Sequence, residues 1–309
     1  MRSRPAALGA IGRTPLVELP LPDGCRGRLL AKAEMLQPGG SVKSRSALGC
    51  IEHGLATGGL APGQPVVEMT SGNMGIGLAV VCGVLGHPFT AYMSRGNSPQ
   101  RANVMQALGA QVVLVDQVDG APGRVTGADI AAAEQRARAD AATTGAWYVD
   151  QFHNPGSVAA HQEGTAVELW EQTDGEINAF VACVGTGGTL IGVARGLKAR
   201  NAEVTALAVE PETAAVLAGR DITDPRHVLQ GAGYGYVPPH WDPDLVDGCL
   251  QVTDADVAEC RTWLAQRCGL HVGFTAAANV QAATSWLQSR DEELTVASVL
   301  GDGGWIYDA

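Results

Sequence analysis

The fold class of this chain is decided by residues 179–198, which read AFVACVGTGGTLIGVARGLK. The apolar run 179–184 has the length of a buried strand, and a glycine-rich turn separates it from a stretch of helix-forming residues. A strand that passes through a glycine loop into a helix is the repeating unit of a parallel α/β sheet. The stretch therefore predicts an α/β protein rather than an all-β sandwich.

The same alternation of apolar runs and helical patterns continues from about residue 28 to the end of the chain. Further strands are predicted at Leu29–Glu34, Val66–Met69, Phe89–Met93, Val112–Val115, Val204–Val209 and Thr295–Leu300. Helices are predicted after Ser98, which precedes a proline, and after Thr253, which has Asp256 three residues further on. With 309 residues, the chain is long enough for two such domains or one large α/β unit.

Composition and charge exclude several classes of function. The net charge of −11 argues against a broad nucleic-acid interface, which requires dense lysine and arginine patches. The seven cysteines are scattered, with no CxxC pair and no zinc-like spacing to histidine, so no metal site is expected. No apolar run approaches the ~20 residues of a membrane span, and the first residues lack the apolar core of a secretory signal. We therefore expect a cytoplasmic protein that binds neither nucleic acid nor a membrane.

Three small-residue loops each follow a predicted strand and precede a helix, where an α/β sheet presents backbone N–H groups to ligands. They are Pro38-Gly39-Gly40-Ser41-Val42-Lys43, Thr70-Ser71-Gly72-Asn73-Met74-Gly75 and Gly185-Thr186-Gly187-Gly188-Thr189. The third has the composition of a phosphate cup, with close backbone approach, two hydroxyls and a helix N-terminus. It matches neither a Rossmann fingerprint nor a P-loop, so a single phosphate fits better than NAD or ATP. A plain glycine-rich turn remains an alternative for this loop taken alone.

The chain contains three lysines, so any amine chemistry has few candidates. Lys198 stands among arginines at a predicted helix C-terminus and is typical of a solvated position. Lys32 lies within a strand, where a paired side chain that snorkels to the surface is expected. Lys43 follows the first glycine loop at a helix start, where the local field and the adjacent Arg45 favour the neutral, nucleophilic amine. A lysine that can form an imine, together with a separate cup for one phosphate, indicates pyridoxal phosphate binding.

An ordered series of motifs carries a family resemblance over essentially the whole chain. The motifs are Gly12-Arg13-Thr14-Pro15-Leu16, the three loops above, Gln151-Phe152-His153-Asn154-Pro155, Gln230-Gly231-Ala232-Gly233 and Gly301-Asp302-Gly303-Gly304. They resemble the cysteine synthase and cystathionine β-synthase family, whose members are fold-type II pyridoxal phosphate enzymes similar to tryptophan synthase β. The resemblance implies a homodimer with two doubly wound open-sheet domains. Residues 1–40 and 150–309 would form the large cofactor-binding domain, and 41–149 the small domain that closes over the substrate.

The resemblance also implies roles for individual residues. Lys43 would hold the cofactor covalently and later remove the substrate α-proton, and Gly185, Thr186, Gly187, Gly188 and Thr189 would bind the phosphate. The substrate carboxylate would be held by Thr70, Ser71, Gly72, Asn73 and Met74, with further contacts from Gln151 and Gly231. Asn73 would also contact the 3′-oxygen of the cofactor, and Gly303 would lie at its pyridine nitrogen. Ser71 as a hydrolase nucleophile and His153 as a general base are the weaker readings of those residues.

The chain departs from the family pattern at four sites. Ser44 follows Lys43 where an acidic residue is usual, Met74 replaces a threonine, and Thr275-Ala276-Ala277 replaces Ser-Ser-Gly. The largest departure is Gly303, which falls where the family generally has a hydroxyl on the pyridine nitrogen. Water, Thr275 or Asp302 could take that place. We expect a water or a hydroxyl and a neutral ring, since a carboxylate partner would favour a protonated pyridinium.

The favoured function is β-replacement on an activated serine such as O-acetylserine or O-phosphoserine, giving cysteine or another β-substituted alanine. The partners implied are that amino acid and a small nucleophile. One alternative is β-elimination from serine or threonine in the same fold. The other is a catalytically quiet relative that binds a partner protein in its cleft.

Overall fold

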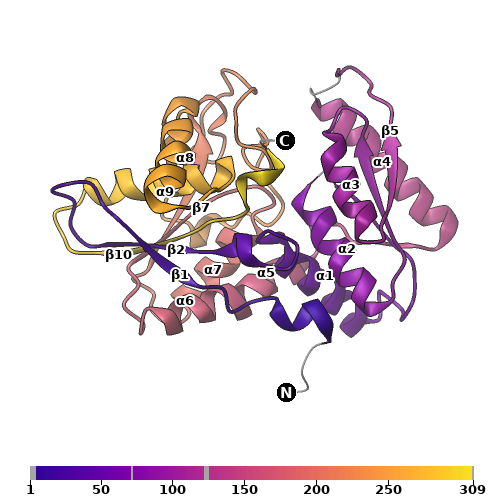
Figure 1. The fold of residues 1–309 in the computed structure, drawn as a ribbon, viewed down its shortest axis with the longest axis horizontal. Helices are drawn as coiled ribbons and strands as arrows, with labels where there is room; N and C mark the ends of the chain where they lie inside the picture. Colours follow the sequence, from indigo (N-terminus) through magenta and orange to yellow (C-terminus); the bar gives the residue numbers. More distant parts are fainter. Residues whose placement is uncertain (1–4, 71, 122–124, 308–309) are drawn as a thin grey trace. The chain divides into compact units, whose positions relative to one another are not determined.

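The computed structural model describes residues 5–70, 72–121 and 125–307, and the chain divides into two compact units (Figure 1). The smaller unit contains the chain up to Ile11 together with Gln37–Ser157. The larger unit contains Gly12–Leu36 and the chain from Val158 onward. The resemblance places the corresponding boundaries at 40 and 149.

The larger unit is built on a six-stranded sheet with the order β1-β2-β10-β7-β8-β9. The strands are β1 (Leu16–Leu19), β2 (Arg28–Lys32), β7 (Ala179–Cys183), β8 (Thr205–Pro211), β9 (Gly248–Val252) and β10 (Thr295–Val299). All neighbours are parallel except β1, which pairs with β2 in the antiparallel sense. The C-terminal strand β10 lies between β2 and β7, so the loops after β7 and β10 leave the same edge of the sheet side by side.

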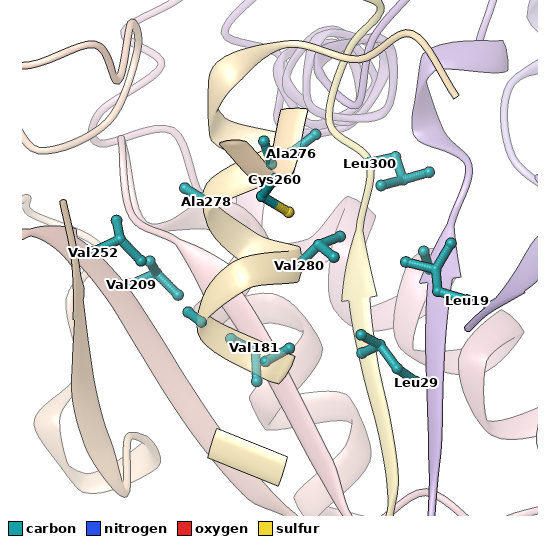
Figure 2. Packing of buried hydrophobic residues seen from close by; sticks show 14 of the residues in the cluster. Leu19, Leu29, Val181, Val209, Val252, Cys260, Ala276, Ala278, Val280 and Leu300 are labelled. Atoms are coloured by element: carbon teal, nitrogen blue, oxygen red, sulfur yellow. The ribbon is translucent and has the colours of Figure 1, made fainter. Parts of the chain in front are cut away.

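Helices cover both faces of this sheet. In Figure 1, α8 (Asp254–Cys268) and α9 (Phe274–Gln288) lie on one side of β10 and β2, and α6 (Ala166–Gln172) and α7 (Gly188–Lys198) on the other. Side chains that alternate along each strand divide between the two layers. Leu29 packs towards α8 and α9, and the next residue, Leu30, packs towards α6 and α7. Figure 2 shows the first layer, in which Val280 of α9 lies near Val181 and Leu29 of the sheet.

The smaller unit is built on a four-stranded parallel sheet with the order β5-β4-β3-β6. Its strands are β3 (Val66–Met69), β4 (Phe89–Ser94), β5 (Gln111–Val115) and β6 (Trp147–Tyr148). Its helices are α1 (Lys43–Thr57), α2 (Asn73–Leu85), α3 (Pro99–Ala107) and α4 (Gly127–Thr144). Val66 packs in the cluster of α1 and α2, whereas Val67 packs against α4. The expectation of an α/β fold with helices on both faces of two open sheets is confirmed.

The remaining helical segments are short. They are η1 (Ala6–Ala10), η2 (Glu34–Leu36), α5 (Pro155–Ala160), the π-helical turn η3 (His161–Thr165), η4 (Glu212–Ala214), η5 (Pro243–Leu245) and η6 (Gly304–Ile306). Among the described residues no helix combines the length and the apolar character needed to cross a membrane.

The seven predicted strands are confirmed within two residues at each end, and both predicted helix starts are confirmed. Ser98 is the N-cap of α3, with Pro99 in its first turn, and the Thr253 hydroxyl accepts a hydrogen bond from the backbone N–H of Asp256 at the start of α8. Strands β1, β6 and β9 were not predicted. The strand β6 has two residues, too few to give a sequence pattern.

Candidate active site

The glycine loop after β7 ends in a helix N-terminus whose N-cap residue is a glycine without a capping side chain. Gly187 is the N-cap of α7 and has φ 89°, a left-handed conformation that favours glycine. The hydroxyl of Thr186 accepts a weak hydrogen bond from the Gly188 N–H at 3.5 Å. A helix start presents several backbone N–H groups and a partial positive charge, which together suit a phosphate.

Close backbone approach makes glycine necessary at Gly185 as well. A Cβ at this position would lie 2.2 Å from the carbonyl oxygen of Gly231, which itself has φ +87°. A Cβ at Gly187 would lie 3.2 Å from the Cβ of His240. The loop is thus a cradle of closely packed backbone with no room for further side chains. Gly185, Thr186, Gly187, Gly188, Thr189 and Gly231 are brought together in the larger unit.

The loop after β10 carries Gly303, the largest departure from the family pattern. Gly303 has φ −79° and ψ 155°, an extended conformation open to any residue, and a Cβ there would lie 3.1 Å from Cδ1 of Trp305. The neighbouring Asp302 is buried, and its carboxylate accepts a hydrogen bond from the Tyr307 hydroxyl at 2.6 Å. The carboxylate also lies close against Gly273, where a Cβ would be 2.1 Å from Oδ1. One oxygen of this carboxylate, Oδ2, is therefore engaged by Tyr307, and the other, Oδ1, lies against the backbone of Gly273.

Lys43 is the first residue of α1 in the smaller unit, as expected, and its side chain is half-buried. Its backbone N–H donates to the Ser41 hydroxyl at 3.3 Å. The Ser44 hydroxyl accepts from the Gly39 N–H at 3.1 Å, and a Cβ at Gly39 would lie 2.7 Å from that oxygen. Ser44 is thus a helix-start contact that fixes the glycine loop in front of Lys43, which gives this departure a structural reason.

The loop after β3 leads into α2, which packs closely on α1. A Cβ at Gly77 of α2 would lie 3.0 Å from the carbonyl oxygen of Lys43, so the two helix starts are neighbours. The Thr70 hydroxyl accepts from the Gly75 N–H at 3.0 Å, Gly72 is the N-cap of α2, and Asn73 is its first residue. Ser71 lies outside the described residues.

Met74 belongs to the hydrophobic core of the smaller unit. It is the second residue of α2 and is 3% exposed, within the cluster that α1 and α2 share. The Met74 side chain therefore packs in the core of the smaller unit.

Gln151 follows β6 and is held by a buried carboxylate that the sequence reasoning missed. Its amide nitrogen donates to Glu68 Oε1 at 3.1 Å and to the Met69 carbonyl at 3.4 Å. Glu68 Oε2 accepts from the Asp150 N–H at 2.9 Å, and Asp150 has the left-handed φ of 56°. Burial raises the pKa of Glu68 to about 8, against the opposing effect of these hydrogen bonds. A charged residue inside the apolar run 66–69 was the signal that could have found it.

The other two lysines have structural partners in the larger unit. Lys32 is fully buried, and its Nζ lies 2.7 Å from Glu168 and 2.6 Å from the Thr14 carbonyl. The expectation of a paired residue is confirmed, but the expectation that it snorkels to the surface is wrong, because the Lys32 side chain is 0% exposed while that of Glu168 is 15% exposed. Lys198 pairs with Asp247 at 2.7 Å near the end of α7.

His153 lies in the turn after β6, and its ring contacts the carboxylate of Asp150 at 2.8 Å. Its side chain is 62% exposed, which fits a turn residue. No group of three or more His, Cys, Asp or Glu side chains suited to a metal ion occurs in the described part of the chain.

Comparison with known proteins shows the family of this chain. A family model described as pyridoxal-phosphate dependent enzyme matches residues 7–300. Cysteine synthase A of Escherichia coli is 36% identical over 298 residues, which cover 94% of this chain and 88% of that protein. An O-acetylserine sulfhydrylase structure from Entamoeba histolytica has a TM-score of 0.89 at 32% identity and covers 100% of this chain and 91% of its own.

A structure of O-ureido-L-serine synthase is similar to a comparable extent. Its TM-score is 0.87 at 33% identity, with 97% of this chain and 92% of that chain covered. The expected fold-type II architecture, the pyridoxal phosphate dependence and the enzyme class are thereby confirmed. With a family model over nearly its whole length and relatives above 30% identity, the chain belongs to the pyridoxal-phosphate-dependent enzymes, in their cysteine synthase family.

Proposed function

We propose that the enzyme catalyses β-replacement on an O-activated serine, with Lys43 as its covalent anchor and acid–base group. The observation that carries the proposal is the position of the three lysines. Lys32 is buried on Glu168 and Lys198 is held at Asp247, whereas Lys43 stands at the start of α1, beside the substrate loop at the start of α2. An amine at such a junction can attack a carbonyl and later exchange a proton with the α-carbon of a bound amino acid.

The residues of the glycine loop fit the cofactor phosphate. The N-terminus of α7 and the Thr186 and Thr189 hydroxyls form a donor set suited to an anion, and glycine at 185 and 187 allows the Gly231 carbonyl and the His240 side chain to pack closely against the loop. Pyridoxal phosphate, when bound, withdraws electrons from an attached amino acid, which acidifies its α-proton and lets a group on its β-carbon depart. The larger unit is therefore the proposed cofactor-binding domain, and the smaller unit supplies Lys43 and the substrate contacts.

Contacts to the substrate carboxylate are assigned to the loop Thr70–Met74 and to Gln151. The N-cap of α2 is Gly72, which has no side chain, and the Thr70 hydroxyl binds the Gly75 N–H. The N–H groups of Asn73 and Met74 are therefore suited to the carboxylate. Gln151 has its amide nitrogen turned towards Glu68 and Met69, so a contact from this nitrogen to a carboxylate requires the amide to turn. Ser71 keeps its expected role as part of the same loop.

The pyridine nitrogen of the cofactor is assigned to a water or a hydroxyl, as the sequence suggests. The engagement of the Asp302 carboxylate with the Tyr307 hydroxyl supports this choice over a carboxylate partner. The ring then stays neutral, which favours β-replacement over other chemistry at the α-carbon. Gly303 contributes backbone and space at this position.

O-acetylserine is the favoured substrate because one similar structure is an O-acetylserine sulfhydrylase, and the nucleophile remains a sulfide-like or amine-like small molecule. The product named for the similar O-ureido-L-serine synthase carries its added group on oxygen, so a small oxygen nucleophile is part of the same proposal. A homodimer and a cytoplasmic location are part of the same proposal.

The test is a spectral and product titration of the purified protein with O-acetylserine, O-phosphoserine, serine and threonine. The proposal expects a yellow protein whose spectrum changes with an O-activated serine, and a new amino acid that forms only when a nucleophile such as sulfide is added. Release of pyruvate or 2-oxobutyrate without a nucleophile would establish elimination instead. A protein without the yellow chromophore would support a catalytically quiet relative.

A further inference from the structure

A buried histidine lies directly behind the hydroxyl of Thr189 in the phosphate cradle. His161 is fully buried, its Nε2 is 3.3 Å from Thr189 Oγ1, and its Nδ1 is 2.9 Å from Thr165 Oγ1. All three residues belong to the larger unit. The imidazole of His161 therefore connects the buried hydroxyl of Thr165 to the hydroxyl of Thr189 in the glycine loop.

The backbone is shaped to bring this ring to the start of α7. His161–Thr165 forms a π-helical turn, an unusual conformation that recurs at functional sites. The turn packs on α7 where glycines remove the side chains, since a Cβ at Gly192 would lie 2.7 Å from the Cβ of His161. A Cβ at Gly196, one turn further along α7, would lie 2.5 Å from the Cβ of Ala166. The close approach places His161 beneath the first turn of α7.

The chemistry of a phosphate decides which ring nitrogen carries the proton. A phosphate dianion offers acceptors only, so a hydroxyl that binds it must donate its single hydrogen to it. The oxygen of Thr189 must then accept, rather than donate, in its contact with His161. This requires a hydrogen on Nε2. In a neutral ring Nδ1 is then an acceptor, and the Thr165 hydroxyl is placed to donate to it.

We propose that His161 is a positioning residue that, with its Nε2 protonated and its Nδ1 held by Thr165, directs the hydroxyl hydrogen of Thr189 towards the cofactor phosphate. The inference rests on the proposed role of the glycine loop as the phosphate site. In the opposite tautomer, the Thr189 hydrogen points at the ring and the lone pairs of its oxygen face the phosphate, which weakens binding.

Two variants of His161 form a matched pair that separates this role from simple packing. His161→Gln places an amide nitrogen near the position of Nε2, where it can still donate to Thr189. His161→Asn places its amide nearer the position of Nδ1 and loses that donation. Both remove the ring, so both change the packing, but only the asparagine variant removes the donor. One lost hydrogen bond to an anion-binding hydroxyl corresponds to about a 5–10-fold weaker affinity.

The experiment measures the binding of pyridoxal phosphate, and of pyridoxal without phosphate, to the apo forms of wild type and both variants. The phosphorus NMR shift of the bound phosphate is a second readout. We expect His161→Asn to lose about 5–10-fold in affinity for pyridoxal phosphate but not for pyridoxal, and His161→Gln to stay within about 2–3-fold of wild type. Nitrogen NMR of histidine-labelled wild-type protein, assigned by the signals missing in His161→Gln, is expected to show a protonated Nε2.

The possible results distinguish an error in the proposed phosphate site from an error in the proposed role of His161. If wild type binds pyridoxal phosphate no better than pyridoxal, the phosphate site itself is wrong. If wild type shows the phosphate advantage and His161→Asn keeps it, or if Nε2 is the unprotonated nitrogen, the positioning role of His161 is wrong. Equal losses of affinity for both ligands in both variants would indicate a packing role and would also overturn the proposal.

Discussion

Gln151 donates its amide nitrogen to the buried carboxyl group of Glu68 at 3.1 Å, and the backbone N–H of Asp150 binds the other oxygen at 2.9 Å. The carboxyl group of Glu68 thus positions both Gln151, a candidate substrate contact, and the preceding residue Asp150, which has a left-handed backbone conformation. Burial raises the pKa of Glu68 from 4.5 to about 8, so the folded protein keeps a proton that the unfolded chain releases between these values. The free energy of unfolding therefore falls as the pH rises through that window.

We predict that Glu68→Gln removes this pH dependence. Between pH 5 and pH 9 the wild type should lose about 2–4 kcal/mol of unfolding free energy relative to the variant, measured by urea unfolding at several pH values. The exposed Glu292 provides the control, since Glu292→Gln should leave the wild-type profile unchanged. Parallel profiles for Glu68→Gln and wild type would show that the group is already ionised in the folded protein across this range.

The pair of the fully buried Lys32 and the largely buried Glu168 gives a second prediction, on stability alone. Lys32→Met leaves the carboxylate of Glu168 without its cation at 2.7 Å and should lower the free energy of unfolding by about 3–5 kcal/mol. Combining it with Glu168→Leu should recover at least half of that loss, because no uncompensated charge remains. The yellow chromophore should survive in both variants.

Lys198→Met is the matched control for the Lys32 experiment. It breaks the pair with Asp247, which is 43% exposed, and should cost less than about 1 kcal/mol. Losses at Lys32 and Glu168 that simply add in the double variant would contradict a coupled pair.

The third prediction concerns Gly303, where the family generally has a hydroxyl. Its extended backbone accepts a side chain, and the nearby Trp305 is 75% exposed and can move. Gly303→Ser should therefore change the free energy of unfolding by no more than about 0.5 kcal/mol and shift the absorption of the bound cofactor, if its hydroxyl reaches the ring. In contrast, Gly187→Ser forces a left-handed position and should cost at least about 1 kcal/mol and weaken cofactor binding. Equal destabilisation by the two variants would show that the backbone conformation or packing at position 303 requires a glycine.

Sequence reasoning found the features that are local in the chain. The strand at Val66–Met69 is found where the apolar run ends in a polar loop, and the N-caps Ser98 and Thr253 follow from residues within one helical turn. The motif order identified the family because each loop follows its strand in a fixed sequence. Such signals depend on the spacing of residues along the chain, which can be read directly from the sequence.

Contacts between segments that are distant in the chain could not be predicted from the sequence. The partner of Lys32 is Glu168, more than a hundred residues away, and only the placement of α6 against the sheet brings them together. For the same reason the hydrogen bond between Gln151 and Glu68 could not be predicted. It forms because β3 and β6 are neighbours in the sheet, and a strand of two residues gives no sequence pattern from which that pairing could be inferred. The close contact of His161 with α7 likewise depends on Gly192. The sequence alone does not show that this glycine is a packing position, because His161 is not known to lie against it until the fold is known.

The central claim is that Lys43 is the amine that holds the cofactor, and one measurement tests it most directly. The purified protein is reduced with borohydride, which fixes a cofactor joined to a lysine, and its peptides are mapped by mass spectrometry. The account predicts a pyridoxal phosphate adduct on Lys43, and in Lys43→Ala no adduct and at least a ~10²-fold loss of turnover. An adduct on Lys32 or Lys198, or full replacement activity in a protein without an adduct on Lys43, would contradict it.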